Sequence, residues 1–507
     1  MVKDQASNMP SFCHFCSVLI FLSSLSSVSF LYWSHYSNSS WFSQDDATSM
    51  QEQQQNEAIH LLSFPKAWNH LSFSSNPPPK FLKIAVFVKK WPQKNQAGGL
   101  ERHALTLHLV LAERGHELHI FTTSSLNSSF PKYSLTNLHF HLSKPTAAGR
   151  LDQAVVWKQF QNQNSTIPFD VIHTESVGLY YTRARNLTNL AVSWHGIAYE
   201  VIHSDIIQEL VRSPDESRSY ALTERIVRIV EEVKFFPSYA HHVATSDYAG
   251  DVLKRIYMIP DERVHVILNG VDNRIFKPEL KLRKDFRKKF GIPESSTSLV
   301  LGMAGRLVKD KGHPLMFEAL KQIFEENETF RKSVYVVVAG DGPWGDRYKN
   351  LGSNLLVLGP LEQSQLAMFY NGIDIFVNPT LRAQGLDHTL LEATVCGKPV
   401  MATKFASITR SVVVSPEMGY TFSPTVASLK EALYMVWRDH RNDRGAMEQK
   451  GEVARQRGLK LFTAVKMAAA YEKLFLCIAS QSQLDKKNVR DDYCRYLPSD
   501  NIAILDK

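Results

Sequence analysis

The chain has 507 residues, of which 44% are hydrophobic and 21% are charged. This length and balance fit two or more packed domains, and they exclude a disordered chain, a collagen-like repeat and a small disulfide-stapled scaffold. Lys and Arg number 58 against 50 Asp and Glu, which gives a formal net charge of +8. So mild an excess on so large a surface does not indicate a nucleic-acid-binding protein.

A stretch without a charged residue, 12–33, lies near the N-terminus. Its length matches a helix that spans a bilayer, and its end, Phe30-Leu31-Tyr32-Trp33, is typical of aromatic residues at a membrane interface. We therefore expect a short cytosolic tail over 1–11 and a transmembrane signal-anchor over 12–33. A cleaved signal peptide is the alternative, because the serines of this stretch lower its hydrophobicity.

Residues 34–80 contain many Ser, Asn and Gln residues and the triplet Pro77-Pro78-Pro79. This composition buries little apolar surface, so it predicts a stem or linker. N-glycosylation tripeptides beyond the expected anchor favour a single-pass protein of the Golgi or ER membrane with a lumenal body. These tripeptides begin at Asn38, Asn127, Asn164, Asn186 and Asn327.

The rest of the chain alternates short apolar runs with helix-length segments, a pattern typical of parallel α/β domains. The first run, 82–88, is followed by a glycine-bearing loop and a helical pattern over 100–114. Further strands are predicted at 117–122, 169–173, 191–195 and 243–246, and a second series at 298–303, 334–339, 355–358, 375–377 and 399–402. The sequence thus predicts two doubly wound domains with a boundary near 273–278.

Three loops that follow predicted strands carry candidate binding residues. Gly98 and Gly99 let the backbone come close to a ligand, and the helix after them offers free N–H groups to an anion, although a simple turn is the alternative. Arg306 and Lys311 have the charges to neutralise a diphosphate, although an exposed charged turn is equally compatible. In the third loop, Glu392 follows on an apolar helix, where a buried carboxylate needs hydrogen bonds such as those of a ribose diol.

Five sequence motifs resemble, in their order along the chain, those of the retaining family-4 glycosyltransferases of the GT-B fold, the "glycosyl transferases group 1" enzymes. The motifs are GGLERH, ILNGVDNRIFKP, GRLVKDKGH, VVVAGDGP and LLEATVCGKPV, and the resemblance covers about 83–480. It implies an α/β fold of two Rossmann-like doubly wound domains that face a cleft. The N-terminal acceptor domain would span 81–275 and the C-terminal nucleotide-sugar donor domain 276–460, with a helix crossing back and a tail in 461–507.

The resemblance also implies roles for individual residues. Arg306 and Lys311 match the pair that contacts the donor diphosphate, which Gly98 and Gly99 meet from the other side. Glu392 matches the second Glu of the family's E-x7-E motif, which holds the ribose. The donor-binding residues implied in this way are Gly98, Gly99, Arg306, Lys311, Gly385, Leu386 and Glu392, and the catalytic ones are Arg306, Lys311, His195 and Gln384.

Two features depart from the family pattern. The first Glu of the E-x7-E motif is Gln384 here, and a Gln stabilises a developing positive charge less well than a carboxylate. Residues 405–410 stand where the family usually has Gly-Gly, which leaves the donor sugar open. His195 matches a histidine that often reaches the sugar, although a structural histidine at a strand end is the alternative.

The implied reaction transfers a sugar from a UDP- or GDP-sugar to a hydroxyl group of a glycan, lipid or small-molecule acceptor, with retention of configuration. Cations and helix N-termini around the leaving diphosphate would make a metal unnecessary. We expect no cofactor, no nucleic-acid partner, and a membrane contact through one N-terminal helix. The alternatives are an inverting enzyme of the same fold and a non-catalytic, membrane-tethered relative that binds a nucleotide sugar or glycan or scaffolds another enzyme.

Overall fold

The computed structural model describes residues 67–483 except 74–75, 93–97, 124–132, 211, 213–216, 218–219, 295–296 and 384–385. The expected anchor at 12–33 and most of the expected stem at 34–80 lie outside the described residues.

The first sheet has seven strands in the order β3-β2-β1-β4-β5-β6-β7, and all neighbouring pairs are parallel. This order begins at the centre, moves to one edge and then returns to the other side, as in a doubly wound domain. The strands are β1 (Lys83–Phe87), β2 (Glu117–Thr123), β3 (Leu138–Ser143), β4 (Val171–Glu175), β5 (Leu190–Trp194), β6 (His241–Ala244) and β7 (Val264–Val266).

The second sheet has six strands in the order β10-β9-β8-β11-β12-β13, again with parallel pairs only. Its winding repeats that of the first sheet. The strands are β8 (Leu299–Ala304), β9 (Val334–Ala339), β10 (Leu355–Gly359), β11 (Ile375–Asn378), β12 (Val400–Thr403) and β13 (Gly419–Phe422).

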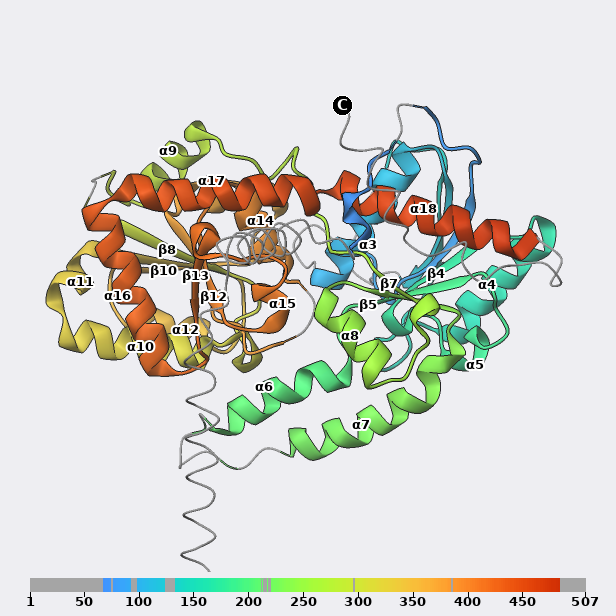
Figure 1. Ribbon diagram of the computed structural model, residues 1–507, viewed down its shortest axis with the longest axis horizontal. Coiled ribbons are helices and arrows are strands. Elements are labelled where there is room, and N and C mark those ends of the chain that lie inside the picture. The colour runs from blue at the N-terminus through green and yellow to red at the C-terminus, as the bar shows by residue number, and fades with distance from the viewer. Residues whose placement is uncertain are drawn as a thin grey trace, which may run out of the picture. The chain divides into compact units, whose positions relative to one another are not determined.

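Helices connect the strands of both sheets (Figure 1). The α-helices are α3 (Gly99–Glu113), α4 (Gln153–Thr166), α5 (Tyr181–Ala184), α6 (Ala198–Leu210), α7 (Ala221–Phe235), α8 (Asp247–Arg255), α9 (Leu280–Lys289), α10 (His313–Glu326), α11 (Glu328–Ser333), α12 (Gly345–Lys349), α13 (Gln363–Gly372), α14 (His388–Val395), α15 (Ala406–Thr409), α16 (Val426–Asn442), α17 (Arg444–Leu461) and α18 (Ala464–Gln483). Short 3-10 turns are η1 (Trp68–His70), η2 (Ser176–Gly178), η3 (Phe236–Ser238), η4 (Asp261–Arg263), η5 (Lys309–Lys311) and η6 (Pro416–Met418).

Successive side chains of a strand point to opposite faces of its sheet, and both faces are buried in hydrophobic clusters. On β1, Ile84 and Val86 pack in one cluster with residues of α3 and α18, whereas Ala85 and Phe87 pack in another with residues of α4 and α8. The central strands therefore read as continuous apolar runs, as is typical of parallel sheets. This architecture confirms the expected class of two Rossmann-like α/β domains.

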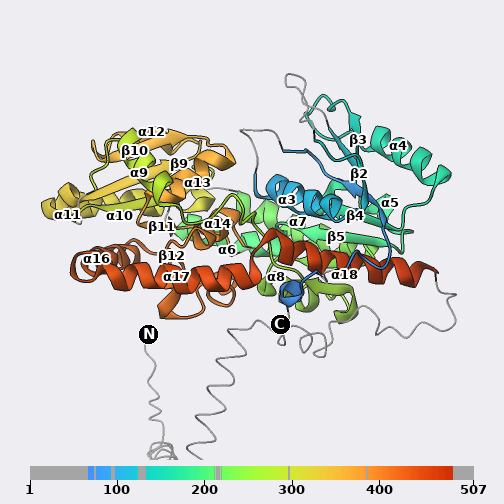
Figure 2. The ribbon, with the colours of Figure 1, turned by 90° about the horizontal axis from the view of Figure 1, so that it is seen from above.

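The last helix, α18, packs against α3 and β4 of the first sheet, although it follows the strands of the second sheet in sequence (Figures 1 and 2). Its apolar side buries Met467, Leu474 and Phe475 in the cluster that also contains Ile84 and Val86 of β1. The C-terminal part of the described chain thus completes the hydrophobic core of the N-terminal half.

A second set of long-range contacts joins the segment between the sheets to the end of α17. Val271 and Thr463 form a parallel bridge. The buried side chain of Asn69 donates to the carbonyl oxygens of Leu268 and Leu461, both at 3.0 Å, and accepts from the backbone N–H of Leu268 at 2.6 Å. Both chain segments that pass between the two sheets are therefore tied to one another.

Candidate active site

In each sheet the winding changes direction beside the first strand, between β1 and β4 in one and between β8 and β11 in the other. Ligands of such sheets bind beyond the carboxyl ends of the strands at this point. Several predicted residues lie there: Gly98 and Gly99 follow β1, Arg306 and Lys311 follow β8, and Leu386 follows β11. The topology thus gives these loops the position expected of a ligand site.

The loops after β8 and β11 are in direct contact. Gly312 has a φ of +78°, and a Cβ atom on it would lie only 1.7 Å from the carbonyl oxygen of Pro379, so only glycine allows this approach. Lys311 Nζ donates to both carboxylate oxygens of Asp387, at 2.6 and 2.7 Å. Burial would raise the pKa of Asp387, but Lys311 and Arg382 beside it hold that pKa below its usual value.

A narrow cavity lies at this contact, with a cationic wall. Its lining residues are Lys311, Asn378, Thr380, Arg382, Leu386, Asp387, Leu390 and Ile408. Burial lowers the pKa of Arg382, and the positive charge of nearby Arg306 acts in the same direction. Arg306 itself is exposed. Lys311 and Arg382 are ion-paired with Asp387 and Asp310. With exposed Arg306, they form a site suited to an anion that can displace these carboxylates.

Glu392 is buried on α14 and fully engaged by protein groups. Arg102 Nη1 donates to one carboxylate oxygen, and the Tyr370 hydroxyl donates to the other at 2.8 Å. Burial raises the pKa of Glu392, whereas Arg102 and Tyr370 oppose that shift. The expectation that a carboxylate here needs hydrogen-bond donors is met by Arg102, a residue of α3 from the other half of the chain.

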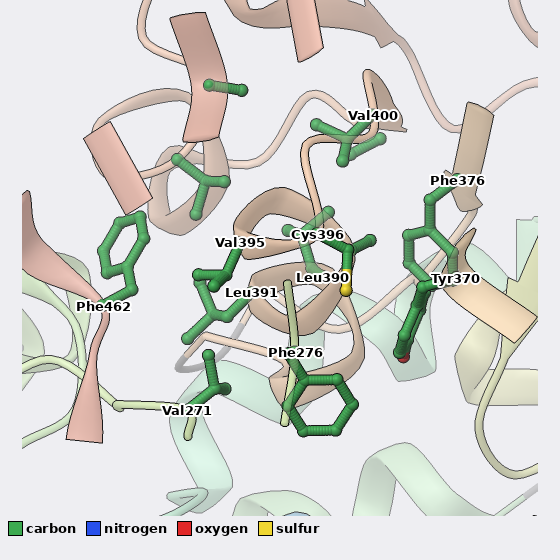
Figure 3. Close-up of a cluster of buried hydrophobic side chains, with 14 of the residues drawn as sticks. Val271, Phe276, Tyr370, Phe376, Leu390, Leu391, Val395, Cys396, Val400 and Phe462 are labelled. Carbon is green, nitrogen blue, oxygen red and sulfur yellow. The ribbon is translucent and has the colours of Figure 1, made fainter. Parts of the chain in front are cut away.

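Apolar packing fixes α14, the helix that carries Glu392. Leu390, Leu391 and Val395 lie in a cluster with residues of the segment between the sheets and with Phe462 (Figure 3). Gly372, on α13, meets the ring of Phe286 so closely that a Cβ would lie 2.1 Å from it. Side chains that are packed to this density hold the backbone of α14 in one position.

The N-termini of α3 and α14 approach each other. A Cβ atom on Gly99 would lie 3.6 Å from His388 Nδ1, and the rings of His103 and His388 have centroids 6.4 Å apart. Each helix N-terminus carries a partial positive charge and unpaired backbone N–H groups. Gly99 thus faces the first turn of α14, whereas a Cβ atom on Gly98 would meet the side chain of Glu101.

His195, directly after β5, is held by Glu175 at the end of β4. The His195 Nε2 atom lies 2.5 Å from Glu175 Oε2. Burial lowers the pKa of His195 to about 4, with the charge of Glu101 opposing, so the ring is neutral at pH 7. Burial also raises the pKa of Glu175. This pairing fixes the ring of His195 and leaves its Nδ1 atom for another partner.

Known protein families match both halves of the chain. One family model, described as Glycosyltransferase Family 4, matches residues 97–274, and another, Glycosyl transferases group 1, matches residues 283–453. Together they cover more than half of the chain. The D-inositol 3-phosphate glycosyltransferase of Xylanimonas cellulosilytica is 24% identical over 368 residues, which are 68% of this chain and 84% of the relative.

Solved structures show the same fold. Sucrose-phosphate synthase from Thermosynechococcus elongatus aligns with a TM-score of 0.61 at 18% identity, over 78% of this chain and 99% of that one. Anabaena HepE in complex with UDP and glucose aligns with a TM-score of 0.55 at 17% identity, over 80% of this chain and 100% of that one. The chain is a family-4 glycosyltransferase of the GT-B fold.

The predicted location of this glycosyltransferase needs correction. No helix within 67–483, so far as that range is described, combines the length and apolar character needed to cross a bilayer. The curated relative named above is bacterial. These findings contradict the expectation of a single-pass Golgi or ER protein with a lumenal body. The stretch 12–33, on which that expectation rested, lies outside the described residues.

The structure describes most, but not all, of the predicted site residues of the glycosyltransferase. Gln384 and Gly385 lie outside the described residues. Leu386 is buried in the cavity wall, and its carbonyl oxygen accepts from Asn269 Nδ2 at 2.8 Å. Lys311 and Leu386 both line the cavity, and Glu392 lies on α14, which begins two residues after Leu386.

Sequence reasoning missed four residues at this site, namely Arg102, Glu175, Arg382 and Asp387. Two of them carried a usable signal, because Arg102 directly follows the Gly-Gly-Leu-Glu word and Asp387 directly precedes α14. Glu175 ends β4 and Arg382 lies four residues after β11, and neither belongs to a distinctive sequence pattern. Their roles became visible only through their contacts with His195 and with the cavity.

Proposed function

We propose that this glycosyltransferase takes a sugar from a UDP- or GDP-sugar and transfers it to an acceptor hydroxyl with retention of configuration, without a metal ion at the diphosphate. The observation that carries the proposal is the cationic cavity at the winding change of the second sheet, where Lys311 and Arg382 line the wall and Arg306 lies nearby. The complex of HepE with UDP and glucose supports a nucleotide-sugar donor.

Stabilisation of the leaving group supplies the main catalytic effect in this proposal. As the glycosidic bond breaks, negative charge accumulates on the diphosphate. Arg306 offers a forked pair of donors, and Lys311 exchanges the carboxylate of Asp387 for phosphate oxygens. Gly98 and Gly99 supply backbone N–H groups at the start of α3. The positive ends of α3 and α14 act in the same direction.

On the sugar side, His195 and Gln384 orient the hydroxyl groups, and Glu392 accepts hydrogen bonds from the ribose. Gly385 and Leu386 complete the donor-binding segment. The departing diphosphate takes the proton of the acceptor hydroxyl, so the proposal assigns no protein nucleophile. The acceptor class is a glycan, a lipid or a small molecule, and the inositol phosphate in the name of the Xylanimonas relative is one such small polyol.

The test measures turnover and donor affinity in two variants, Arg306→Ala and Lys311→Ala, with added UDP- and GDP-sugars. Slow hydrolysis of the donor serves as the readout, because it needs no knowledge of the acceptor. We expect turnover to fall about 100- to 1,000-fold with a smaller loss of donor affinity, as for other groups that act mainly in the transition state.

Lys309→Ala is the matched control. It removes a cation from the same loop, and we assign no role to Lys309. Retention is checked by determining the anomeric configuration of the product. Equal losses of affinity and turnover in Arg306→Ala and Lys311→Ala would contradict leaving-group stabilisation. A strict requirement for added Mg²⁺ or Mn²⁺ would contradict the metal-free diphosphate site.

A further inference from the structure

The first turn of α14 carries a buried histidine whose ring is incompletely hydrogen-bonded. His388 is the first residue of this helix and is 5% exposed. Its Nε2 atom is buried and has no hydrogen-bond partner among the described residues. A buried polar atom without a partner costs stability, and native proteins keep few of them. At a ligand site, the ligand can supply the missing partner.

Two contacts align the first turns of α14 and α3. Arg102 of α3 binds Glu392 of α14, and a Cβ atom on Gly99 would lie 3.6 Å from His388 Nδ1. Gly99 is three residues before Arg102, and His388 is four residues before Glu392. The two helices therefore lie side by side in the same direction over these residues, with their N-termini at the same end.

The region where these N-termini meet suits an anion. Each N-terminus carries a partial positive charge and N–H groups without partners in the helix. No side-chain cap is present on either helix at this end. A neutral imidazole can carry its hydrogen on either ring nitrogen, and a protonated one carries hydrogen on both. His388 can therefore offer an N–H at Nε2 to an anion whatever the charge of its ring.

Ring contacts place His388 between the expected positions of the sugar and the ribose. The rings of His388 and His103 have centroids 6.4 Å apart, and those of His103 and His195 have centroids 4.5 Å apart. His195 is the residue proposed to orient the sugar. On the other side, Glu392, proposed to hold the ribose, lies about 6 Å further along the axis of α14. In a nucleotide sugar the diphosphate joins the ribose to the sugar, and its β-phosphate is the one bonded to the sugar.

We propose that His388 Nε2 donates a hydrogen bond to the β-phosphate of the donor. This inference rests on the proposed function and adds a donor-contacting residue to it. As the bond between the sugar and the β-phosphate oxygen breaks, the electron pair stays on that oxygen, so the hydrogen bond from His388 strengthens in the transition state. His388 forms no covalent bond and transfers no proton in this role. Because it is nearly enclosed, the phosphate reaches it only when the first turns of α3 and α14 separate.

The test begins with His388→Phe, which keeps a ring of similar size and removes both ring nitrogens. His440→Phe on α16 is the matched control. His440 is 2% exposed, neither of its ring nitrogens has a hydrogen-bond partner among the described residues, and we assign it no role. Replacing an unpartnered polar atom by an apolar group removes a cost of burial, so urea unfolding should show little loss of stability in either variant.

Binding is measured by titration with UDP and GDP and, for comparison, with UMP and GMP. His388→Phe should weaken diphosphate binding about 10-fold, as for the loss of one hydrogen bond to a charged group, and leave monophosphate binding nearly unchanged. Hydrolysis of the donor should fall further, about 100-fold, because the contact strengthens in the transition state. His388→Gln, with an amide N–H near the place of Nε2, should recover part of both losses.

The outcomes separate this inference from the proposed function. Unchanged diphosphate affinity and hydrolysis in folded His388→Phe, with Lys311→Ala impaired, would overturn this inference alone. Equal losses for the diphosphate and the monophosphate would overturn the assignment to the β-phosphate. A wild type that neither binds UDP or GDP nor hydrolyses their sugars would overturn the proposed function as well.

A structure of the wild type with bound UDP or GDP tests the contact even if His388→Phe does not fold. We expect His388 Nε2 within about 3.2 Å of a β-phosphate oxygen, the upper limit for a hydrogen bond of this kind. A separation above about 4 Å would overturn the inference, since no hydrogen bond spans it.

Discussion

At the scale of single residues, the ion pair between Arg102 and Glu392 changes the role that the sequence implies for Glu392. Glu392 is expected to receive a ribose, yet its two oxygens are bound by Arg102 and Tyr370. A nucleotide must therefore share or displace a partner that is already present. The pair also joins the two halves of the chain, so it affects folding as well as binding.

We expect Arg102→Met and Glu392→Gln each to lower the free energy of unfolding by about 3–5 kcal/mol, because each leaves a buried partner without its counter-charge. The double variant should recover more than half of the summed loss. Urea unfolding of the four proteins measures this cycle. If the two losses simply add, the pair has no energetic coupling.

Nucleotide titration of the same proteins separates folding from binding. Glu392→Gln should weaken nucleotide binding by about 1–3 kcal/mol, the range for a charge-assisted hydrogen bond in a desolvated site. Tyr370→Phe is the control for the second partner of Glu392, since it removes one donor and keeps the ring. An unchanged affinity in folded Glu392→Gln would reduce Glu392 to a structural residue.

Because Glu200 is buried on α6, we expect the free energy of unfolding to depend on pH. Burial raises its pKa from 4.5 to about 8. Between these pH values the unfolded chain has lost the proton that the folded chain keeps, so stability falls as the pH rises through this window. Glu200→Gln stays neutral, and we expect it to exceed the wild type at pH 8.5 by as much as about 4 kcal/mol, since one pKa unit corresponds to about 1.4 kcal/mol.

At pH 4.5 the two proteins should have nearly equal stability. Thermal unfolding across this range is the measurement. Glu231→Gln, on the exposed side of α7, controls for the change in net charge. A gain of the same size at both pH values would show that ionisation of Glu200 is not the cause.

At the scale of elements, the close approach of the loop after β8 to the loop after β11 depends on Gly312. Gly312 and Gly291 both have positive φ, at +78° and +64°, but only Gly312 has an atom in the path of a Cβ. Gly291→Ala should cost about 1 kcal/mol from its conformation alone. Gly312→Ala should cost more and should also lower nucleotide affinity, because Lys311 must move with the loop.

Urea unfolding and nucleotide titration of both variants test this difference. The matched pair separates the strain of a left-handed backbone from the collision with Pro379. Equal effects of the two substitutions on stability would contradict the geometry described here.

The strands show which part of the fold the sequence predicts. The central strands appear as continuous apolar runs, and each predicted run lies within about two residues of a strand. The strands missed are β3, β7 and β13, which are edge strands. In β3 only Leu138 and Ser143 are buried, so its sequence lacks the signal of a buried strand. β7 and β13 are mostly buried but have only three and four residues, which is too short a run to stand out in the sequence.

The site divides in a similar way. Arg306, Lys311 and Glu392 were predictable because each lies in a short sequence motif whose chemistry can be inferred from its own residues. Their partners were not, because Arg102 lies 290 residues from Glu392 and Asp387 lies 76 residues from Lys311. One sequence does not reveal which distant residues meet. Such contacts arise from the packing of whole domains.

At the scale of the whole molecule, α18 makes the first domain depend on the last part of the described chain. Glu472 on this helix binds Arg114 at 3.1 Å and His116 at 3.0 Å. Phe475→Ala should lower the free energy of unfolding by about 3–5 kcal/mol, as expected for a large side chain that is fully buried.

Val465→Ala, at an exposed position of the same helix, should change stability by less than about 0.5 kcal/mol. Urea unfolding followed by tryptophan fluorescence reports on the first domain through buried Trp91 and Trp194. If Phe475→Ala affects only signals of the second domain, α18 does not support the first.

The same crossing sets the order in which the protein can be completed during synthesis. All strands of the first sheet have left the ribosome once Val266 has emerged, but α18 ends about 220 residues later, at Gln483. At about 5–20 residues per second, this delay lasts about 10–40 s. For that time the apolar surface of α3 and β1 that α18 later covers is open to water. The first domain therefore reaches its native state only after the second has been made, and the interval gives molecular chaperones a defined surface to protect.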